Sequence, residues 1–320
     1  MDAMGGLLDG PRARGAFALR ARMAAPWSID VRDEAALSVV AVVEGTAWIR
    51  VAGGPPVSAG PGDVALLRGP EPYTFADTPD RPPTVIILPG QHCASPTGES
   101  LSAAMDLGVR TWGNSRRGET VMLIGSYQGD GEISRRLTDA LPPLALLRDG
   151  EWDTPVVPIL VAEIGRELPG QAVVLDRLLD LLVISGLRAW FSRPAAEPPA
   201  WFAAHADPVV GRAIALLHDA PERPWTVGGL AAEVGLSRAA LARRFHDVVG
   251  EPPMGYLTGW RLALAADLLL ESDTTVSAVS RRVGYSSPFT FSTAFKRAYG
   301  RSPSEYRSAR PGAVRAAAGP

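Results

Sequence analysis

Aromatic, hydroxyl-bearing and basic side chains are concentrated in residues 284–307, GYSSPFTFSTAFKRAYGRSPSEYR. Phe291, Phe295 and Tyr299 recur at helical spacing and predict a buried stripe, whereas Lys296 and Arg297 lie off that stripe. Basic and hydroxyl side chains of this kind can bind phosphate groups through hydrogen bonds and charge. The segment is therefore interpreted either as the ordinary end of an amphipathic helix or as a surface that another molecule recognises.

A repeat relates this segment to an earlier part of the chain. At an offset of 49 residues, Thr226, Val227, Leu230, Val234 and Gly235 match Thr275, Val276, Val279, Val283 and Gly284. At an offset of 50, Phe245, Gly250, Pro253 and Tyr256 match Phe295, Gly300, Pro303 and Tyr306. One structural unit is thus expected twice, as a first copy (residues 226–256) and a second copy (residues 275–306).

Each copy has the signals of two short helices joined by a tight turn. Thr226 and Thr275 are typical residues to cap the first helix, and a glycine at 235 or 284 suits a turn with positive φ. The second helix then begins after Ser237 in the first copy and after Ser286 or Ser287 in the second. Its expected buried residues are Leu241, Phe245 and Val248 in the first copy, matching the stripe named above in the second. This pattern predicts two helix-turn-helix units.

Residues 253–271 are predicted to form the helix that joins the two copies. A helix of that length spans about 28 Å. Successive major grooves on one face of DNA lie about 34 Å apart, so one chain can place a helix in each of two neighbouring grooves.

At this point the sequence resembles a known family. Residues 207–310 resemble the DNA-binding domain of AraC/XylS-type transcription regulators, most specifically through GYSSPFTFSTAFKRAYGRSPSEYR. The first copy and the joining helix match through PWTVGGLAAEVGLSRAALARRFHDVVGEPPMGYLTGWRLALAADLL. More loosely, APWSI, GTAWIRV, PGDVALL and LDRLLDLLVISGLRAWF resemble the cupin-type effector domain and dimerisation helices of one branch of that family.

The resemblance implies which residues contact DNA. In the first copy the matching positions are Arg238, Ala239, Ala242 and Arg243, and in the second they are Ser287, Pro288, Phe289, Ser292, Thr293, Lys296 and Arg297. Arg243 is expected to read guanine through two hydrogen bonds, the two alanines to offer only apolar contact, and Arg238 to bind phosphate. The family often has Arg where this chain has Thr293, so the second copy is expected mainly to position the protein through Ser287, Lys296 and Arg297 on phosphates. Phe289 is interpreted either as a base contact or as a core residue, and Arg244 and His246 as solvated.

The region from about Ala16 to about Tyr127 contains short apolar runs between turn residues, including AFALRARM, LSVVAVV, GTAWIRV, DVALL, TVIIL and ETVMLIGSY. This pattern predicts an antiparallel β barrel or sandwich, and the resemblance named above implies a barrel of cupin type. Cupin enzymes hold a metal with several histidines, but this region offers only His92, so no metal, cofactor or catalytic residue is expected. Trp48, Arg50, Tyr73 and Phe75 are candidates to line an effector pocket, with burial in the core as the alternative. Cys93 beside His92 leaves a redox-sensing thiol as a second option.

Two helices are predicted at residues 156–168 and 171–191. The second has an apolar surface wider than one neighbour needs, which indicates a homodimer, with packing on its own barrel as the alternative. Charges at Asp176, Arg177, Asp180 and Arg188 exclude it as a membrane span. With one cysteine and no signal peptide, the protein is expected to be cytoplasmic.

Taken together, these features predict an α+β multidomain protein of 320 residues. The expected domains are a cupin-like effector domain (1–130), a helical dimerisation segment (131–192), a linker (193–206), an all-α DNA-binding domain (207–310) and a disordered tail (311–320). Residues 205–310 carry 13 basic and 10 acidic side chains, whereas the whole chain has a net charge of −2. The expected function is sequence-specific transcription regulation, as an activator that contacts promoter DNA, RNA polymerase and a small-molecule effector. A cupin-type enzyme tethered to DNA and an architectural or repair-associated DNA-binding protein are the alternatives.

Overall fold

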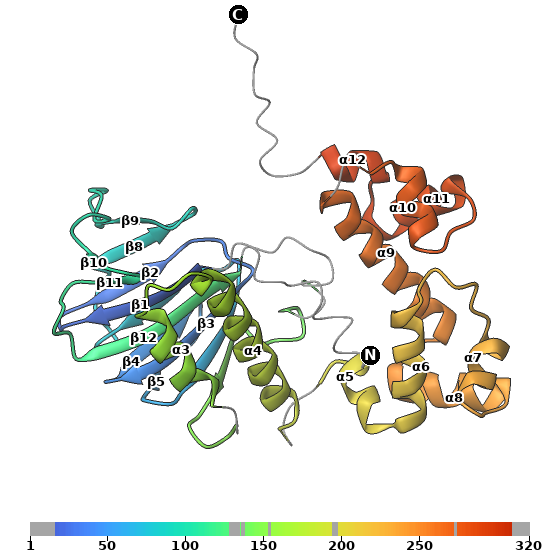
Figure 1. Cartoon of the computed structure of the whole chain (residues 1–320), viewed down its shortest axis with the longest axis horizontal. Helices are drawn as coiled ribbons and strands as arrows, with labels where there is room; N and C mark the ends of the chain where they lie inside the picture. The colour runs from blue at the N-terminus through green and yellow to red at the C-terminus, as the bar shows by residue number, and fades with distance from the viewer. Residues whose placement is uncertain are drawn as a thin grey trace, which may run out of the picture. The chain divides into compact units, whose positions relative to one another are not determined.

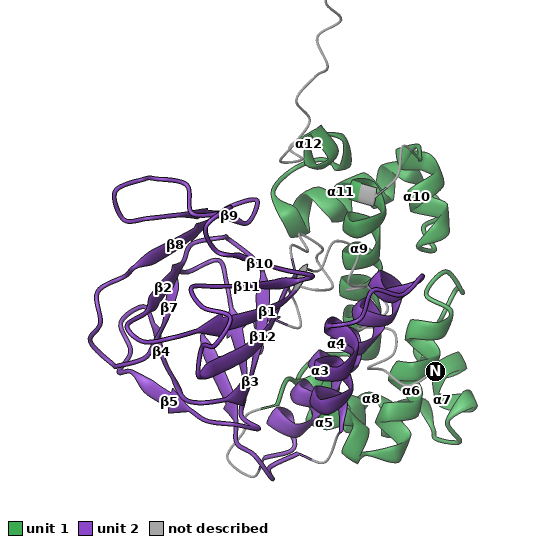
Figure 2. Ribbon diagram, turned by 60° about the vertical axis from the view of Figure 1, so that its left-hand side comes forward, with its two compact units in different colours: residues 1–10, 131–134, 198–320 green, residues 11–130, 135–197 purple. Residues whose placement is uncertain are grey.

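The computed structural model describes residues 17–127, 135, 138–152, 155–193, 198–271 and 274–308. The described residues form two compact parts, a β-rich part that ends at residue 193 and a helical part that begins at residue 198 (Figures 1 and 2). The predicted tail at residues 311–320 lies outside the described residues.

The strands described in the β-rich part form two sheets. A seven-stranded sheet has the order β10-β11-β1-β12-β3-β6-β13, and a six-stranded sheet has the order β5-β4-β7-β2-β8-β9. In chain order the strands are β1 (Phe17–Met23), β2 (Ser28–Val31), β3 (Leu37–Glu44), β4 (Ala47–Val51), β5 (Val57–Ala59), β6 (Val64–Arg68), β7 (Tyr73–Ala76), β8 (Val85–Leu88), β9 (His92–Ala94), β10 (Asp106–Gly108), β11 (Thr111–Gly113), β12 (Thr120–Tyr127) and β13 (Leu144–Leu147).

The predicted antiparallel barrel is wrong in two respects. β1 pairs with β11 in parallel, as β2 does with β8, so both sheets are mixed. Within the described residues each sheet also ends in edge strands, β10 and β13 in one and β5 and β9 in the other, so no closed barrel forms. β11 reaches β1 only after the chain has passed through the other sheet, and a connection of that kind does not impose the antiparallel direction that a hairpin does.

The core of this part lies between the two sheets. Met23 and Met122 from the seven-stranded sheet pack with Trp27, Ile49 and Phe75 in one buried cluster. β3 is buried on both faces from Leu37 to Val42, which accounts for its mainly apolar run LSVVAVV. Val40 and Val42 of this strand face the inter-sheet core.

Two helices cover the outer face of the seven-stranded sheet (Figure 2). α3 (Val156–Ile164) contacts β1, and α4 (Gln171–Phe191) contacts β1, β6 and β13. The alternative that α4 packs on its own β-rich part is therefore observed. Its buried residues include Leu175, Leu179, Leu182 and Leu187. The opposite side of α4 remains exposed at Val173, Val174 and Leu181. Among the described helices, none is long and apolar enough to cross a membrane.

The segment 131–192 is predicted to be helical, but only part of it is. β13 lies within it and pairs with β6, because the apolar run LALL completes the edge of a sheet. A short apolar run of this kind cannot be assigned to a helix or a strand by its spacing alone. α3 is also shorter than predicted, since it ends at Ile164 before Gly165.

The helical part contains α5 (Ala200–Ala203), a 3₁₀ turn η1 (Ala204–Ala206), α6 (Pro208–Asp219), α7 (Val227–Glu233), α8 (Arg238–Val249), α9 (Pro253–Glu271), α10 (Val276–Arg282), α11 (Pro288–Tyr299) and α12 (Pro303–Ser308). The expected linker at residues 193–206 thus includes α5 and η1. α5 contacts α8, and Trp201 on α5 is nearly buried.

Candidate nucleic-acid interface

Two helix-turn-helix units are present at the predicted positions, α7–α8 and α10–α11 (Figure 1). The hydroxyl of Thr226 accepts a hydrogen bond from the backbone N–H of Gly229 at 3.0 Å, and that of Thr275 accepts one from Ala278 at 3.2 Å. Both threonines are therefore N-caps of the first helix, in agreement with the repeat.

The turn between the helices is also equivalent in the two copies. Gly235 has φ of 71° and Gly284 has φ of 83°, both in the left-handed region that favours glycine. The second helix starts after Ser237 in the first copy and after Ser287 in the second, each with its side chain accepting a backbone hydrogen bond. Of the two serines considered for the second copy, Ser287 is therefore the cap.

The buried side of each second helix determines which side faces outward. The buried residues of α8 are Leu241, Phe245 and Val249. The prediction was correct for the first two, but it named Val248 where the structure buries Val249. On α11, Phe291 and Phe295 are fully buried, and Tyr299 is half-buried with its ring centroid 4.6 Å from that of Phe295. The residues between these positions are consequently held toward solvent.

The outward face of α8 carries the four residues expected in the first copy. Arg238, Ala239 and Arg243 are exposed, and Ala242 is half-buried. Arg243 forms no ion pair or hydrogen bond with a described residue, so its guanidinium group can approach a base edge.

The neighbouring arginine, Arg244, has a structural role that the sequence did not reveal. Its Nε donates to Asp207 Oδ2 at 2.6 Å. The same carboxylate caps α6 by accepting from the backbone N–H groups of Val209 and Val210. Burial acts to raise the pKa of Asp207, but the hydrogen bonds from Arg244 and from these two amides outweigh it, so the pKa lies below its ordinary value.

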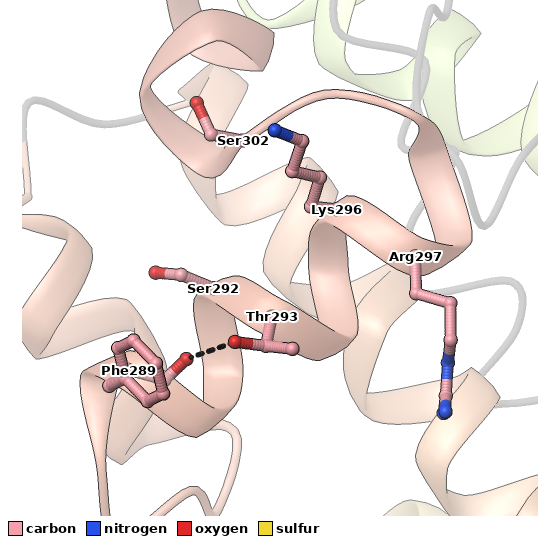
Figure 3. Close-up of a pocket in the computed structure, with 6 residues that line it drawn as sticks. All are labelled: Phe289, Ser292, Thr293, Lys296, Arg297 and Ser302. Atoms are coloured by element: carbon pink, nitrogen blue, oxygen red, sulfur yellow. Dashed lines mark hydrogen bonds between the residues drawn. The ribbon is translucent and has the colours of Figure 1, made fainter.

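The outward face of α11 borders a hollow of about 320 Å³. Figure 3 shows the six residues that line it, namely Phe289, Ser292, Thr293, Lys296, Arg297 and Ser302. The first five belong to the expected set, while Pro288 and Ser287 lie at the start of the same helix. Phe289 is 82% exposed, which excludes the core position considered for it.

Ser302 was not among the residues predicted to contact DNA, although the sequence around it predicts the start of a helix. It precedes α12 in the run Ser-Pro-Ser-Glu, and its backbone N–H donates to Glu305 Oε2 at 2.7 Å while its hydroxyl accepts from the N–H of Glu305 at 3.3 Å. This reciprocal pair is a capping box, which a Ser-x-x-Glu pattern predicts.

α9 and its contacts hold the two copies within one part. Its 19 residues correspond to about 28 Å of helix, as expected. Arg261 on α9 donates through Nε to the carbonyl of Pro221 at 2.6 Å and through Nη2 to that of Arg223 at 2.8 Å. The turn at Gly284 packs against the intervening Glu222, so the second copy contacts the loop that precedes the first.

The four effector-pocket candidates are not brought together. Tyr73 and Phe75 are buried in the core between the sheets, as the alternative for them stated. Trp48 and Arg50 alternate with buried Ile49 on β4, so they lie on the opposite face of the sheet. Arg50 there forms an ion pair with Asp80 at 2.7 Å.

Cys93 lies in an environment opposite to that of a reactive thiol. Its side chain is buried, and its Sγ is 3.9 Å from Sδ of Met105. Burial raises the pKa of the thiol, whereas redox-sensing cysteines have a lowered one. His92 is exposed, because adjacent residues on β9 point to opposite faces. Among the described residues, no three His, Cys, Asp or Glu side chains are grouped so that they can hold a metal.

Comparison with known proteins extends these observations over most of the chain. Residues 2–192 match the cupin family, and residues 230–309 match the helix-turn-helix domain family. An AraC-like transcription regulator of Streptomyces lividans is 31% identical over 287 residues, which cover 88% of this chain and 90% of the relative. The chain belongs to the AraC-like transcription regulators.

Two further similar proteins align with different lengths of this chain. The transcriptional regulator AlkR of Acinetobacter baylyi is 28% identical, covering 96% of this chain and 99% of the relative. Among solved structures, the DNA-binding domain of AdpA in complex with a target DNA is 34% identical over 32% of this chain and 92% of that chain, with a TM-score of 0.31. From the two family matches and the regulator of Streptomyces lividans, the protein is a DNA-binding transcription regulator with a cupin-like N-terminal domain.

Proposed function

We propose that this regulator binds promoter DNA in a sequence-specific manner, with α8 and α11 in two successive major grooves. The observation that carries the proposal is the presence of two equivalent helix-turn-helix units whose outward faces are exposed and partly basic. α9 separates them by a length close to the repeat of the major groove. The contacts of Arg261 and Gly284 support a fixed spacing between the two units.

Within this arrangement the first unit reads bases and the second mainly binds phosphates. Arg243 reads a guanine through its two-pronged guanidinium group, while Ala239 and Ala242 leave room for the base edges and Arg238 binds a phosphate. In the second unit Ser287, Lys296 and Arg297 bind phosphates and fix the register of the protein on the duplex. Arg244 is not included, since it is engaged with Asp207.

The regulator acts as a homodimer through α3 and α4. Support for this part of the proposal comes from the exposed apolar side chains of Ile159 on α3 and of Val173, Val174 and Leu181 on α4. Two chains joined in this way offer four helix-turn-helix units to one promoter, which raises affinity through effective concentration.

The cupin-like part controls DNA binding in response to a small-molecule effector in the cytoplasm, and the bound protein activates transcription by contacting RNA polymerase. This role is supported by the match of residues 2–192 to the cupin family and by the regulators among its relatives. A ligand that binds the folded protein raises its melting temperature, so a thermal-shift screen of metabolites tests this part directly.

The central experiment is a DNA selection. The full chain is incubated with random-sequence duplexes, the bound DNA is sequenced, and the Kd for the selected site is compared with that for a scrambled duplex at ~150 mM salt. We expect the selected site to bind at least ~10³-fold more tightly, the range of specific regulators. Equal binding to both duplexes would contradict the proposal and favour the architectural alternative.

A further inference from the structure

Phe289 occupies an unusual place for an aromatic residue. It is the second residue of α11, directly after Pro288, and it is the most exposed large apolar side chain among the described residues. Phe291 and Phe295 on the same helix are fully buried, so the exposure of Phe289 is not a consequence of a loose core. Its ring lies at one end of the hollow in Figure 3.

Thr293 extends the apolar character of this surface. It lies one helical turn after Phe289, and its hydroxyl donates to the carbonyl oxygen of Phe289 at 3.0 Å (Figure 3). A threonine that bonds back to its own helix in this way has its hydroxyl occupied. The methyl group is then the part of this exposed side chain that is available to a ligand.

The charges on α11 are confined to its other end. Lys296 and Arg297 lie one turn further along, they are exposed, and neither forms an ion pair within the described part of the chain. Recognition helices place their N-terminal residues against base edges. The end of α11 that faces the bases is therefore apolar, and the basic end is suited to the phosphates.

The hydrogen-bonding groups left at the base-facing end discriminate poorly. Ser292 is half-buried beside the hollow, and a hydroxyl group can donate to or accept from any base. Among the groups that base pairs present in the major groove, the C5-methyl of thymine is the apolar one. Its partner on a protein is an exposed apolar side chain.

We propose that Phe289, together with the methyl group of Thr293, contacts the C5-methyl group of a thymine and determines the specificity of the second helix-turn-helix unit. This inference rests on the proposed function, and it adds a base-reading role to a helix expected mainly to bind phosphates. It predicts a site in which one half contains a guanine read by Arg243 and the other half contains a required thymine.

The test removes only the methyl group. Each thymine of the selected DNA is replaced in turn by deoxyuridine, and the Kd of the full chain is measured by fluorescence anisotropy. In the half-site bound by α11 we expect one or two replacements to weaken wild-type binding about fourfold, which corresponds to the loss of one buried methyl group. The Phe289→Ala variant should bind thymine and deoxyuridine duplexes equally at those positions.

Two variants serve as matched controls. Phe289→Leu keeps an apolar side chain and should preserve the preference for thymine, while Arg243→Ala should keep it and lose the guanine preference in the other half-site. Because Phe289 and Arg243 are both exposed, none of these changes disturbs the core. If no deoxyuridine replacement weakens binding, or if Phe289→Ala retains the preference, the inference is wrong although specific binding stands. If the wild type itself shows no specific binding, both the proposed function and this inference are refuted.

Discussion

At the scale of single residues, substitutions of Arg243 and Lys296 test the proposed difference between a residue that reads a base and one that binds a phosphate. Arg243 is exposed on α8, and replacing it with Ala would remove the proposed two-pronged contact, which is worth about 1–3 kcal/mol against the wrong base. We expect Arg243→Ala to relax the selected sequence at one base pair and leave the other positions unchanged. Repeating the DNA selection with this variant measures the effect, and Arg243→Lys, which keeps the charge without the fork, should relax the same base pair.

Lys296→Ala should behave differently, because a lysine on a phosphate carries no sequence information. Its removal should weaken binding to selected and scrambled duplexes by the same factor. It should also reduce the slope of log K against log salt concentration by about one, as expected for one lost phosphate contact. Anisotropy titrations at several salt concentrations provide the slope. A change in the selected sequence with an unaltered slope would contradict this assignment.

The limits of sequence reasoning at this scale are seen in the side chains that alternate along a strand. Trp48, Arg50, Tyr73 and Phe75 all lie in strands. However, β4 and β7 pair so that the first two and the last two lie on opposite faces. Register determines this separation, and no local pattern contains the register of two distant strands. The exposure of Phe289 likewise depends on the packing of α11, whereas the helix caps depend on neighbouring residues and were predicted correctly.

At the scale of elements, the two turn glycines form an internal comparison. Gly235 and Gly284 share a positive φ, but a Cβ at Gly235 meets no atom within 4 Å, while one at Gly284 lies 2.7 Å from Cα of Glu222. Gly235→Ala should therefore cost only the left-handed penalty of about 1–2 kcal/mol. Gly284→Ala should cost about 2–5 kcal/mol, because the backbone must also move.

Amide hydrogen exchange is measured for each variant on peptides that cover α7–α8 and α10–α11. It gives the free energy of opening of each helix-turn-helix unit separately. The wild-type protein provides the reference for both peptides. Equal destabilisation by the two substitutions would mean that the contact with Glu222 does not hold the second unit in place.

Asp207 couples the N-terminus of α6 to α8 and gives this contact a dependence on pH. Since its pKa is lowered on folding, the extra stability is present above about pH 4, near the unfolded value, and is lost as the pH falls through the folded pKa. Asp207→Ala should cost about 1 kcal/mol at neutral pH, and Asp207→Asn less, because an amide oxygen still caps the helix. Exchange rates of α6 amides report both costs.

The comparison between wild type and Asp207→Asn isolates the charge. The difference in stability between them should be small, since Arg244 is partly exposed, and it should decrease as the pH is lowered from about 4 to about 3. A difference that persists unchanged at that pH would exclude the ion pair with Arg244 as its cause.

Long elements with a clear period were predicted better than short ones. α4 and the second helices of both repeats agree with their predicted positions, because a buried stripe over several turns has a recognisable spacing. β9, β10 and β11 each have three residues and lie between the predicted runs TVIIL and ETVMLIGSY, where no strand was predicted. A strand of that length shows no measurable alternation and exists because a neighbouring strand supplies hydrogen bonds.

At the scale of the whole molecule, the exposed apolar residues of α4 connect its fold to its assembly. One side of this helix is covered by the seven-stranded sheet, whereas the described residues leave the side with Val173, Val174 and Leu181 exposed. Leu181→Glu should convert the proposed dimer to a monomer, since it places a charge in an apolar contact that excludes water. Sedimentation velocity at micromolar concentration measures the mass directly.

Leu88→Glu is the matched control for this prediction. Leu88 is 39% exposed and Leu181 is 43% exposed, so both substitutions place the same charge at a similarly exposed apolar position. Because Leu88 lies at the end of β8, away from α4, this variant should remain a dimer. A monomeric Leu181→Glu variant should also bind the selected DNA more weakly, because each chain then binds without the effective concentration that its partner provides. If the wild type sediments as a monomer, or if both variants dissociate alike, α4 is not the dimer interface.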